Sequence, residues 1–104
     1  MVVNQSLNPE DNIDLVERYF EENFKEYVLI KKTNYTGYWW VEYVNGIDVK
    51  ICFDGDTGGH FSVKIFIDNT EYFLWQFDRS VNSRTQSTSE NILYQLKVLK
   101  IFIK

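Results

Sequence analysis

Two side chains that can do covalent chemistry, a thiol and an imidazole, lie eight residues apart: Cys52 is the only cysteine and His60 the only histidine. A thiol, an imidazole and an orienting carboxylate together make a cysteine nucleophile, and neighbouring strands could bring this pair together. No oxyanion-stabilising motif accompanies them, and one thiol with one imidazole cannot fill the four positions of a zinc site. We therefore expect no enzyme, no cofactor and no metal site, and interpret Cys52 as a packed thiol.

The segment 54–59, DGDTGG, begins like a calcium-binding loop. An EF-hand loop needs a third oxygen ligand at its fifth position and a glutamate at its twelfth. Gly58 and Ile65 occupy those positions here. Because aspartate and glycine are also the residues that turns favour, the segment is predicted to be a turn between strands.

Acidic residues are concentrated in one stretch, residues 10–26, which holds seven of the chain's 15 acidic residues against only Arg18 and Lys25, a net charge of −5. The whole chain carries −4, so the remainder is close to neutral. Pro9 is a good first helical residue, and Asn8 can cap the helix before it. The apolar positions recur every three or four residues and predict an amphipathic helix over residues 9–26. They are Ile13, Val16, Phe20, Phe24 and Tyr27.

Four carboxylates of this helix are predicted to lie close together without a cation among them. Charged residues opposite an apolar stripe are ordinary in helices, and a solvated face is the alternative interpretation. Ordinary faces mix the two signs, however, whereas like charges four residues apart repel each other. We therefore predict a partner-binding surface formed by Glu10, Asp14, Glu17 and Glu21.

Beyond the helix the apolar period shortens to two, which predicts antiparallel strands. The expected strands are residues 27–30, 38–44, 47–53, 61–67 and 71–77. A polar segment, 78–88, is expected to be a loop, and Ser87 with Glu90 forms a capping box for a second helix over residues 88–104.

The hairpin at Asn45-Gly46 has two possible registers. A two-residue turn would pair Val44 with Ile47 and place Glu42 in the core. A three-residue loop would pair Tyr43 with Ile47 and place Glu42 outside. We favour the second register, because an unpaired buried carboxylate is costly.

Together these elements predict a single α+β domain spanning residues 1–104. An N-terminal helix, an antiparallel meander sheet of about five strands and a C-terminal helix follow one another, with both helices on one face of the sheet. The residues expected to be buried between helices and sheet are Phe20, Ile51, Val63, Trp75 and Leu96.

The opposite sheet face is predicted to carry aromatic and apolar side chains, of which Trp40 and Tyr72 are the predicted partner-binding residues. Tyr38, Phe66 and Leu74 would share this face. Such a face is typical of a protein-contact surface. The alternatives are that the sheet curls over it or that a homodimer covers it.

The net charge of −4 and the absence of a basic stripe argue against direct nucleic-acid binding. The apolar runs are too short to cross a membrane. The first residues show no secretory signal pattern, and a lone cysteine suits a reducing compartment, so we expect a cytoplasmic protein. An acidic protein favours a basic protein partner.

The favoured function is therefore a small, acidic, non-catalytic binding protein that neutralises a basic partner. In size, charge and lack of catalytic motifs it resembles bacterial toxin-immunity proteins and phage-encoded inhibitors of nucleic-acid enzymes, although no motif carries the likeness. One alternative is a small chaperone-like adaptor dimer. The other is a pocket protein or enzyme with a cavity under the curved sheet, lined by Trp39, Tyr43, Phe53, Phe73 and Trp75.

Overall fold

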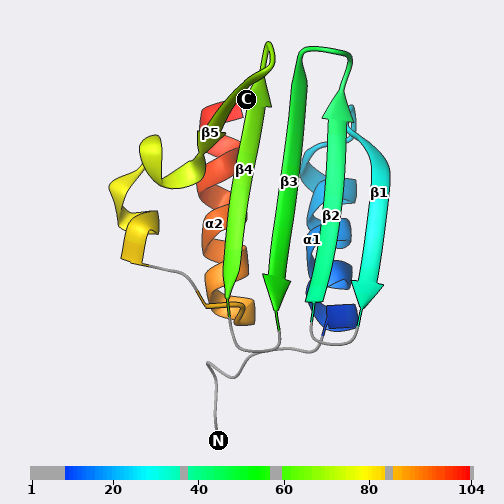
Figure 1. Cartoon of the computed structure of the whole chain (residues 1–104), viewed down its shortest axis with the longest axis vertical. Coiled ribbons are helices and arrows are strands. Elements are labelled where there is room, and N and C mark those ends of the chain that lie inside the picture. Colours follow the sequence, from blue (N-terminus) through cyan, green and yellow to red (C-terminus); the bar gives the residue numbers. More distant parts are fainter. Residues whose placement is uncertain (1–8, 36–37, 57–59, 84–85, 104) are drawn as a thin grey trace, which may run out of the picture.

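The computed structural model describes residues 9–35, 38–56, 60–83 and 86–103 (Figure 1). A helix, five strands, two short 3-10 helices and a second helix follow one another along the chain. Their bounds are α1 Pro9–Asn23, β1 Val28–Tyr35, β2 Tyr38–Asn45, β3 Val49–Asp56, β4 Phe61–Ile67, β5 Thr70–Phe73, η1 Leu74–Gln76, η2 Arg79–Ser83 and α2 Ser89–Ile103.

The five strands form one antiparallel sheet in which each strand pairs with the next along the chain, in the order β1-β2-β3-β4-β5. Both helices lie on the same side of this sheet, α1 behind β1 and β2 and α2 beside β4 and β5 (Figure 1). The side that they cover is named the helix face, and the opposite side the outer face. This arrangement confirms the predicted α+β fold.

The alternation of the central strands decides which side chains enter the core. Ile51 and Val63 point to the helix face, where they meet Phe20 of α1 and Leu96 of α2, and all four are at most 3% exposed. These four predicted core residues are confirmed. Neighbouring side chains of the same strands point to the outer face, because successive residues of a strand alternate.

The β2–β3 turn lies two residues later than predicted. Asn45 pairs with Val49, so residues 46–48 form the loop, and the predicted pairing of Tyr43 with Ile47 is wrong. Ile47 is instead 98% exposed in the turn. Because the pairing is displaced by an even number of residues, every side chain of β2 keeps the face predicted for it, with the glutamate outside.

The first strand is longer than its sequence pattern indicates. Residues 31–35 continue β1, although their polar character predicted a break. Ile30 is left over where the register shifts between Leu29 and Lys31, which marks a bulge. Only β2 pairs with this edge strand, so most of its side chains face solvent and need not be apolar.

The last strand ends at Phe73, four residues before its predicted end. The chain continues as the 3-10 helix η1, and the alternation between faces stops there. Leu74 consequently enters the core at 1% exposed, whereas Trp75 is 44% exposed. The predicted burial of Trp75 is therefore wrong, and so is the predicted place of Leu74 on the face opposite the helices.

Helix α2 begins one residue later than its predicted capping box. Thr88 is the cap, because its Oγ1 accepts a hydrogen bond from the N–H of Asn91 at 3.2 Å. The predicted cap, Ser87, is buried, and its hydroxyl donates to the carbonyl oxygen of Asp56 at 3.4 Å. This contact ties the start of α2 to the end of β3.

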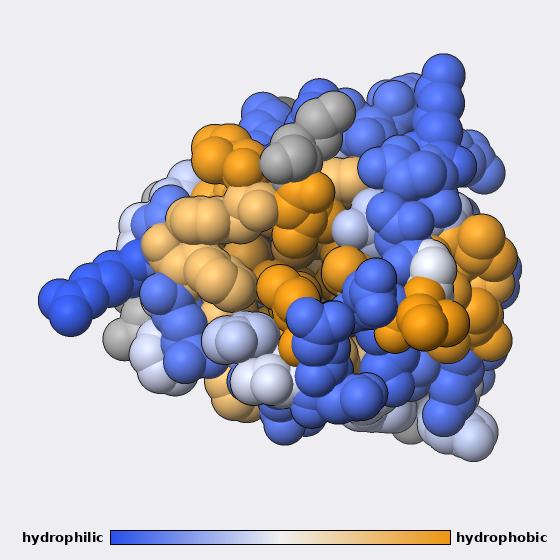
Figure 2. Space-filling model, turned by 90° about the horizontal axis from the view of Figure 1, so that it is seen from above, coloured by the Kyte–Doolittle hydropathy of each residue, from blue (hydrophilic) through white to orange (hydrophobic). Residues whose placement is uncertain are grey.

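Apolar side chains are exposed at the end of the molecule where β1 starts and α2 finishes, the upper end of Figure 1, which Figure 2 shows from above. Val28 is 60% exposed, Ile47 98% and Ile101 75%. Exposed apolar area gathered at one end is the kind of surface that an association between copies covers. The homodimer stays a prediction, which sedimentation equilibrium would check.

The buried indole of Trp39 in β2 packs directly on the backbone of Gly55 in β3. A β-carbon at residue 55 would lie 2.4 Å from Trp39 Nε1 and 2.8 Å from the carbonyl oxygen of His60. The indole cannot withdraw easily, because it stacks on Phe61 at a centroid distance of 5.7 Å. This position therefore requires glycine for a close approach rather than for its backbone freedom.

We expect Gly55→Ala to lower the free energy of unfolding by about 3 kcal/mol through overpacking. Gly46→Ala is the matched control: it has φ +66° but nothing within 4 Å of the added β-carbon. That control should lower the free energy of unfolding by about 1 kcal/mol, which is the cost of a β-carbon at positive φ alone. Urea denaturation measures both, and equal losses would contradict the packing of Trp39 on Gly55.

Candidate functional site

Four carboxylates form one stripe along α1, on the side of the helix next to the edge strand β1. The acidic stripe consists of Glu10, Asp14, Glu17 and Glu21. Their spacing of four, three and four residues keeps them on one side of the helix. All are exposed except Glu17, which is half-buried. Four of the six predicted partner-binding residues are therefore brought together.

One cation does meet the acidic stripe, contrary to the prediction. Lys32 of β1 places its Nζ 3.2 Å from a carboxylate oxygen of Glu17. Both side chains keep contact with solvent, and exposed pairs of this kind contribute only about 0–1 kcal/mol. Among the described residues, this is the one ion pair that involves the stripe, which stays anionic overall.

Two hollows run along the seam between α1 and β1, and the acidic stripe borders both. The first, of about 420 Å³, lies between Glu10 and Asp14 on the helix and Lys32 on the strand. The second, of about 350 Å³, is bordered by Glu17 and Glu21 and is named the Glu17–Glu21 hollow. The predicted acidic surface is thus a grooved surface, with carboxylates along one wall.

Tyr43 of β2 lies in the Glu17–Glu21 hollow. Its ring stacks on Phe20 with centroids 3.9 Å apart, and the residue is only 5% exposed. Burial raises the pKa of the Tyr43 hydroxyl, and the negative charges of Glu17 and Glu21 raise it further. The sequence pattern predicts Tyr43 only on the core side of its strand or in the wall of a cavity under the sheet, with no part in the acidic surface. The feature that could have indicated a role in the site is the Tyr43 hydroxyl, since a buried tyrosine usually has a polar partner.

The two aromatic residues predicted to bind a partner lie on opposite faces of the sheet. Trp40 is on the outer face, where its Nε1 donates to Glu42 Oε2 at 2.5 Å and Lys31 Nζ lies 5.8 Å from its ring centroid. Tyr72 pairs with Ile65, a core residue, and so lies on the helix face. The predicted surface shared by Trp40 and Tyr72 is therefore wrong. A role of either residue alone stays a prediction.

Lysine side chains lie over other aromatic rings of the outer face. Lys50 Nζ is 4.9 Å from the ring centroid of Phe66, and Lys64 Nζ is 5.9 Å from that of Phe73. Their alkyl stems shield the rings while the ammonium groups remain hydrated. The outer face consequently presents less bare aromatic surface than its sequence indicates, which favours the α1–β1 seam as the candidate site.

The thiol and the imidazole are not brought together. Cys52 pairs with Lys64 and is 4% exposed on the outer face. His60 lies just before β4, where its carbonyl oxygen accepts a hydrogen bond from the N–H of Asp56 at 3.0 Å. His60 lies four residues before Lys64, the residue opposite Cys52. In an extended strand this is a separation of about 13 Å along the chain.

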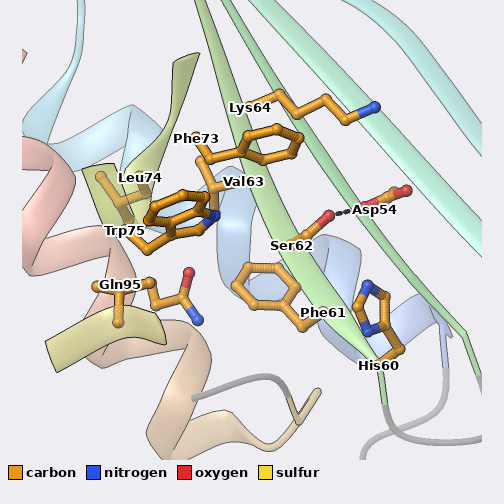
Figure 3. A pocket seen from close by; sticks show the side chains of 11 residues that line it. Asp54, His60, Phe61, Ser62, Val63, Lys64, Phe73, Leu74, Trp75 and Gln95 are labelled. Carbon is orange, nitrogen blue, oxygen red and sulfur yellow. Dashed lines mark hydrogen bonds between the residues drawn. The ribbon is translucent and has the colours of Figure 1, made fainter. Parts of the chain in front are cut away.

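Polar groups gather instead in a hollow of about 410 Å³ beside β4 (Figure 3). Ser62 Oγ donates a hydrogen bond to Asp54, and His60 lines the same hollow. Among the described residues, no hydrogen bond joins the His60 ring to either side chain, so the base–nucleophile contact of a catalytic set is missing. Of the residues expected to line a cavity under the sheet, Phe73 and Trp75 border this hollow, whereas Trp39 and Phe53 are fully buried in the core.

Within the described ranges, no group of three or more His, Cys, Asp or Glu side chains is placed to hold a metal ion. The two aspartates of segment 54–59 are engaged elsewhere: Asp54 accepts from Ser62, and Asp56 Oδ1 accepts from the N–H of His60 at 3.0 Å. Residues 57–59 lie outside the described part of the chain.

Comparison of the chain with known protein families, curated proteins and solved structures finds no match. In the part of the chain that the structure describes, neither helix combines the length and apolar character needed to span a membrane.

The packed thiol should be unreactive in the folded protein. Burial, followed by the charge of Glu42, raises the pKa of Cys52 from 9.0 to about 11. Because the thiolate is the reactive form, iodoacetamide should alkylate the folded protein at pH 8 about 100-fold more slowly than the urea-unfolded chain. In the folded protein the rate should keep rising to about pH 11. Mass spectrometry of timed samples measures both rates, and equal rates at pH 8 would show that Cys52 is accessible.

Proposed function

We propose that this protein binds a basic protein partner through the acidic stripe and the α1–β1 seam, and thereby inhibits that partner in the manner of an immunity protein. The observation that carries the proposal is the pair of hollows along the seam, both bordered by carboxylates of the stripe. A convex acidic helix would attract cations without fixing them, whereas a grooved surface can seat individual side chains.

The charge distribution supports a partner rich in lysine and arginine. Residues 10–26 carry a net charge of −5 in a chain whose total is −4. A field this one-sided raises the rate at which basic proteins encounter the α1 side of the molecule. Like charges held together on one helix reduce stability, so their retention is more easily explained by binding than by folding.

The rest of the molecule supports a binding role over catalysis. The core between helices and sheet is filled by large side chains such as Trp39, Phe20 and Phe53, each at most 2% exposed. The hollow beside β4 lacks the contact between base and nucleophile described above. An inhibitor needs only a rigid surface of complementary charge and shape, and a small domain that packs α1 firmly on a sheet provides one.

A small adaptor dimer is the second candidate. The observation that favours it is the apolar end with Val28, Ile47 and Ile101, because a second copy could bury those side chains. The two functions use different surfaces, so neutralising the acidic stripe should leave such a dimer intact.

The test removes the charges of the acidic stripe without changing side-chain size, by Glu10→Gln, Asp14→Asn, Glu17→Gln and Glu21→Gln. Affinity purification from the native cell supplies the basic partner for surface plasmon resonance. We expect the association rate at low salt to fall about 10- to 100-fold and its salt dependence to flatten. Thermal stability should be unchanged or slightly higher, because repulsion within the helix is relieved.

The matched control removes the same number of charges elsewhere, at exposed positions of α1, two turns and α2. It carries Glu22→Gln, Asp48→Asn, Asp68→Asn and Glu90→Gln. The control should change the association rate no more than about 3-fold, since only the overall charge is altered. Equal effects of the two quadruple variants would show that net charge, rather than the seam, drives association.

A further inference from the structure

We propose that the Glu17–Glu21 hollow is the specificity site of the seam and takes one arginine side chain of the partner. This inference rests on the proposed function and makes it more specific. Glu17 and Glu21 lie one helical turn apart and border the same hollow. Side chains at this spacing are neighbours on the helix surface, so both carboxylates can reach one guanidinium group.

A third acceptor is the hydroxyl of Tyr43. The residue is 5% exposed and lies in the hollow with both glutamates. No hydrogen bond of this hydroxyl is found among the described residues. The hydroxyl is not among the fully buried polar atoms that lack a partner, so it still touches solvent in the hollow, where a donor from a partner can reach it. This acceptor is independent of the acidic charge and can receive a hydrogen bond from a donor on the ligand.

The packing around Tyr43 keeps this acceptor in place. Its ring is stacked on Phe20 at 3.9 Å with an interplanar angle of 19°, so the hydroxyl cannot swing away without breaking the stack. Leu29 of β1 also lines the hollow and offers an apolar surface for an alkyl stem. The hollow therefore combines a fixed floor with two charged acceptors.

The chemistry favours arginine over lysine. Three residues with acceptor groups border the hollow, two from α1 and one from β2. A guanidinium presents five N–H donors in a planar fork, whereas an ammonium is a compact point charge with three donors. The volume of about 350 Å³ accommodates one such side chain.

Two lysines already lie near these carboxylates, and an incoming guanidinium would have to displace their ammonium groups. Lys32 Nζ is 3.2 Å from Glu17, with 47% of its side chain exposed, and Lys25 borders the hollow. An ion pair this exposed is weak, so an incoming guanidinium can displace Lys32 at little cost. Lys32→Gln should therefore tighten arginine binding about 2-fold by freeing Glu17.

The probe for this site is Nα-acetyl-arginine amide, titrated into the full chain and followed by amide chemical shifts. We expect millimolar binding, with the largest shifts at residues 17–21, 29 and 43. The lysine analogue should bind about 3-fold more weakly, and the uncharged citrulline analogue should not bind measurably. Shifts spread evenly along the whole of α1 would overturn the proposal.

Variants of the hollow complete the test. Glu17→Gln with Glu21→Gln should weaken probe binding at least about 10-fold, and Tyr43→Phe, which keeps the ring stack, about 3-fold. The matched control, Glu10→Gln with Asp14→Asn, removes two charges from the same stripe and should weaken binding less than about 2-fold. A Tyr43→Phe variant that is folded, by its amide spectrum, and binds like the wild type would contradict the role of the hydroxyl.

The outcome separates this inference from the proposed function. If partner binding depends on Glu10 and Asp14 as strongly as on Glu17 and Glu21, and not on Tyr43, the arginine site is wrong while the acidic surface stands. If partner binding survives removal of all four carboxylates, the proposed function is wrong, whatever the probe does in the hollow.

Discussion

The stacking of Phe20 on Tyr43 holds α1 to the sheet, and the geometry of the seam depends on it. The ring of Phe20 also meets Phe53 edge-on at 5.6 Å and Tyr27 edge-on at 5.9 Å. Aromatic pairs of this kind contribute about 0.5–1.5 kcal/mol each beyond the area they bury. Contacts on several sides of one ring fix both the height and the rotation of α1. Glu21, about 100° further round the helix, is thereby held beside β1.

This constraint has an electrostatic consequence. Helix α1, which Phe20 anchors, places Glu17 and Glu21 close enough to Tyr43 to raise the pKa of its hydroxyl. Among the described residues, Lys32 is the only cation paired with the acidic stripe. A fold selected for stability alone would place more cations here, because pairs of opposite sign four residues apart stabilise helices. In the part of the chain that the structure describes, the stripe instead has a single ion pair, between Lys32 and Glu17.

Periodicity accounts for most of what could be predicted about the fold. The change from a helical to a two-residue period placed both helices and the central strands, because these elements bury one face along their whole length. It failed where burial is weak or the chain turns. Polar residues 31–35 extend β1 because an edge strand needs few apolar side chains. Trp75 is exposed because β5 ends two residues before it, and no local signal marks that end.

The candidate site was predictable only in part, for a similar reason. The spacing of the acidic stripe lies within one helix, so the sequence alone shows that its members share a side. Its relation to Lys32 and Tyr43 depends on which strands lie under α1, which is a tertiary property. The predicted link between Trp40 and Tyr72 failed because the register of β5 places Tyr72 opposite Ile65 and hence on the helix face.

The most direct test of the account is the footprint of the partner on this protein, measured by hydrogen–deuterium exchange in the complex and in the free chain. Binding through the seam predicts protection in residues 9–23 of α1 and 28–35 of β1, with unchanged exchange in β4 and α2. Protection of the strands β3 and β4 without protection of β1 would place the partner on the outer face and contradict the account.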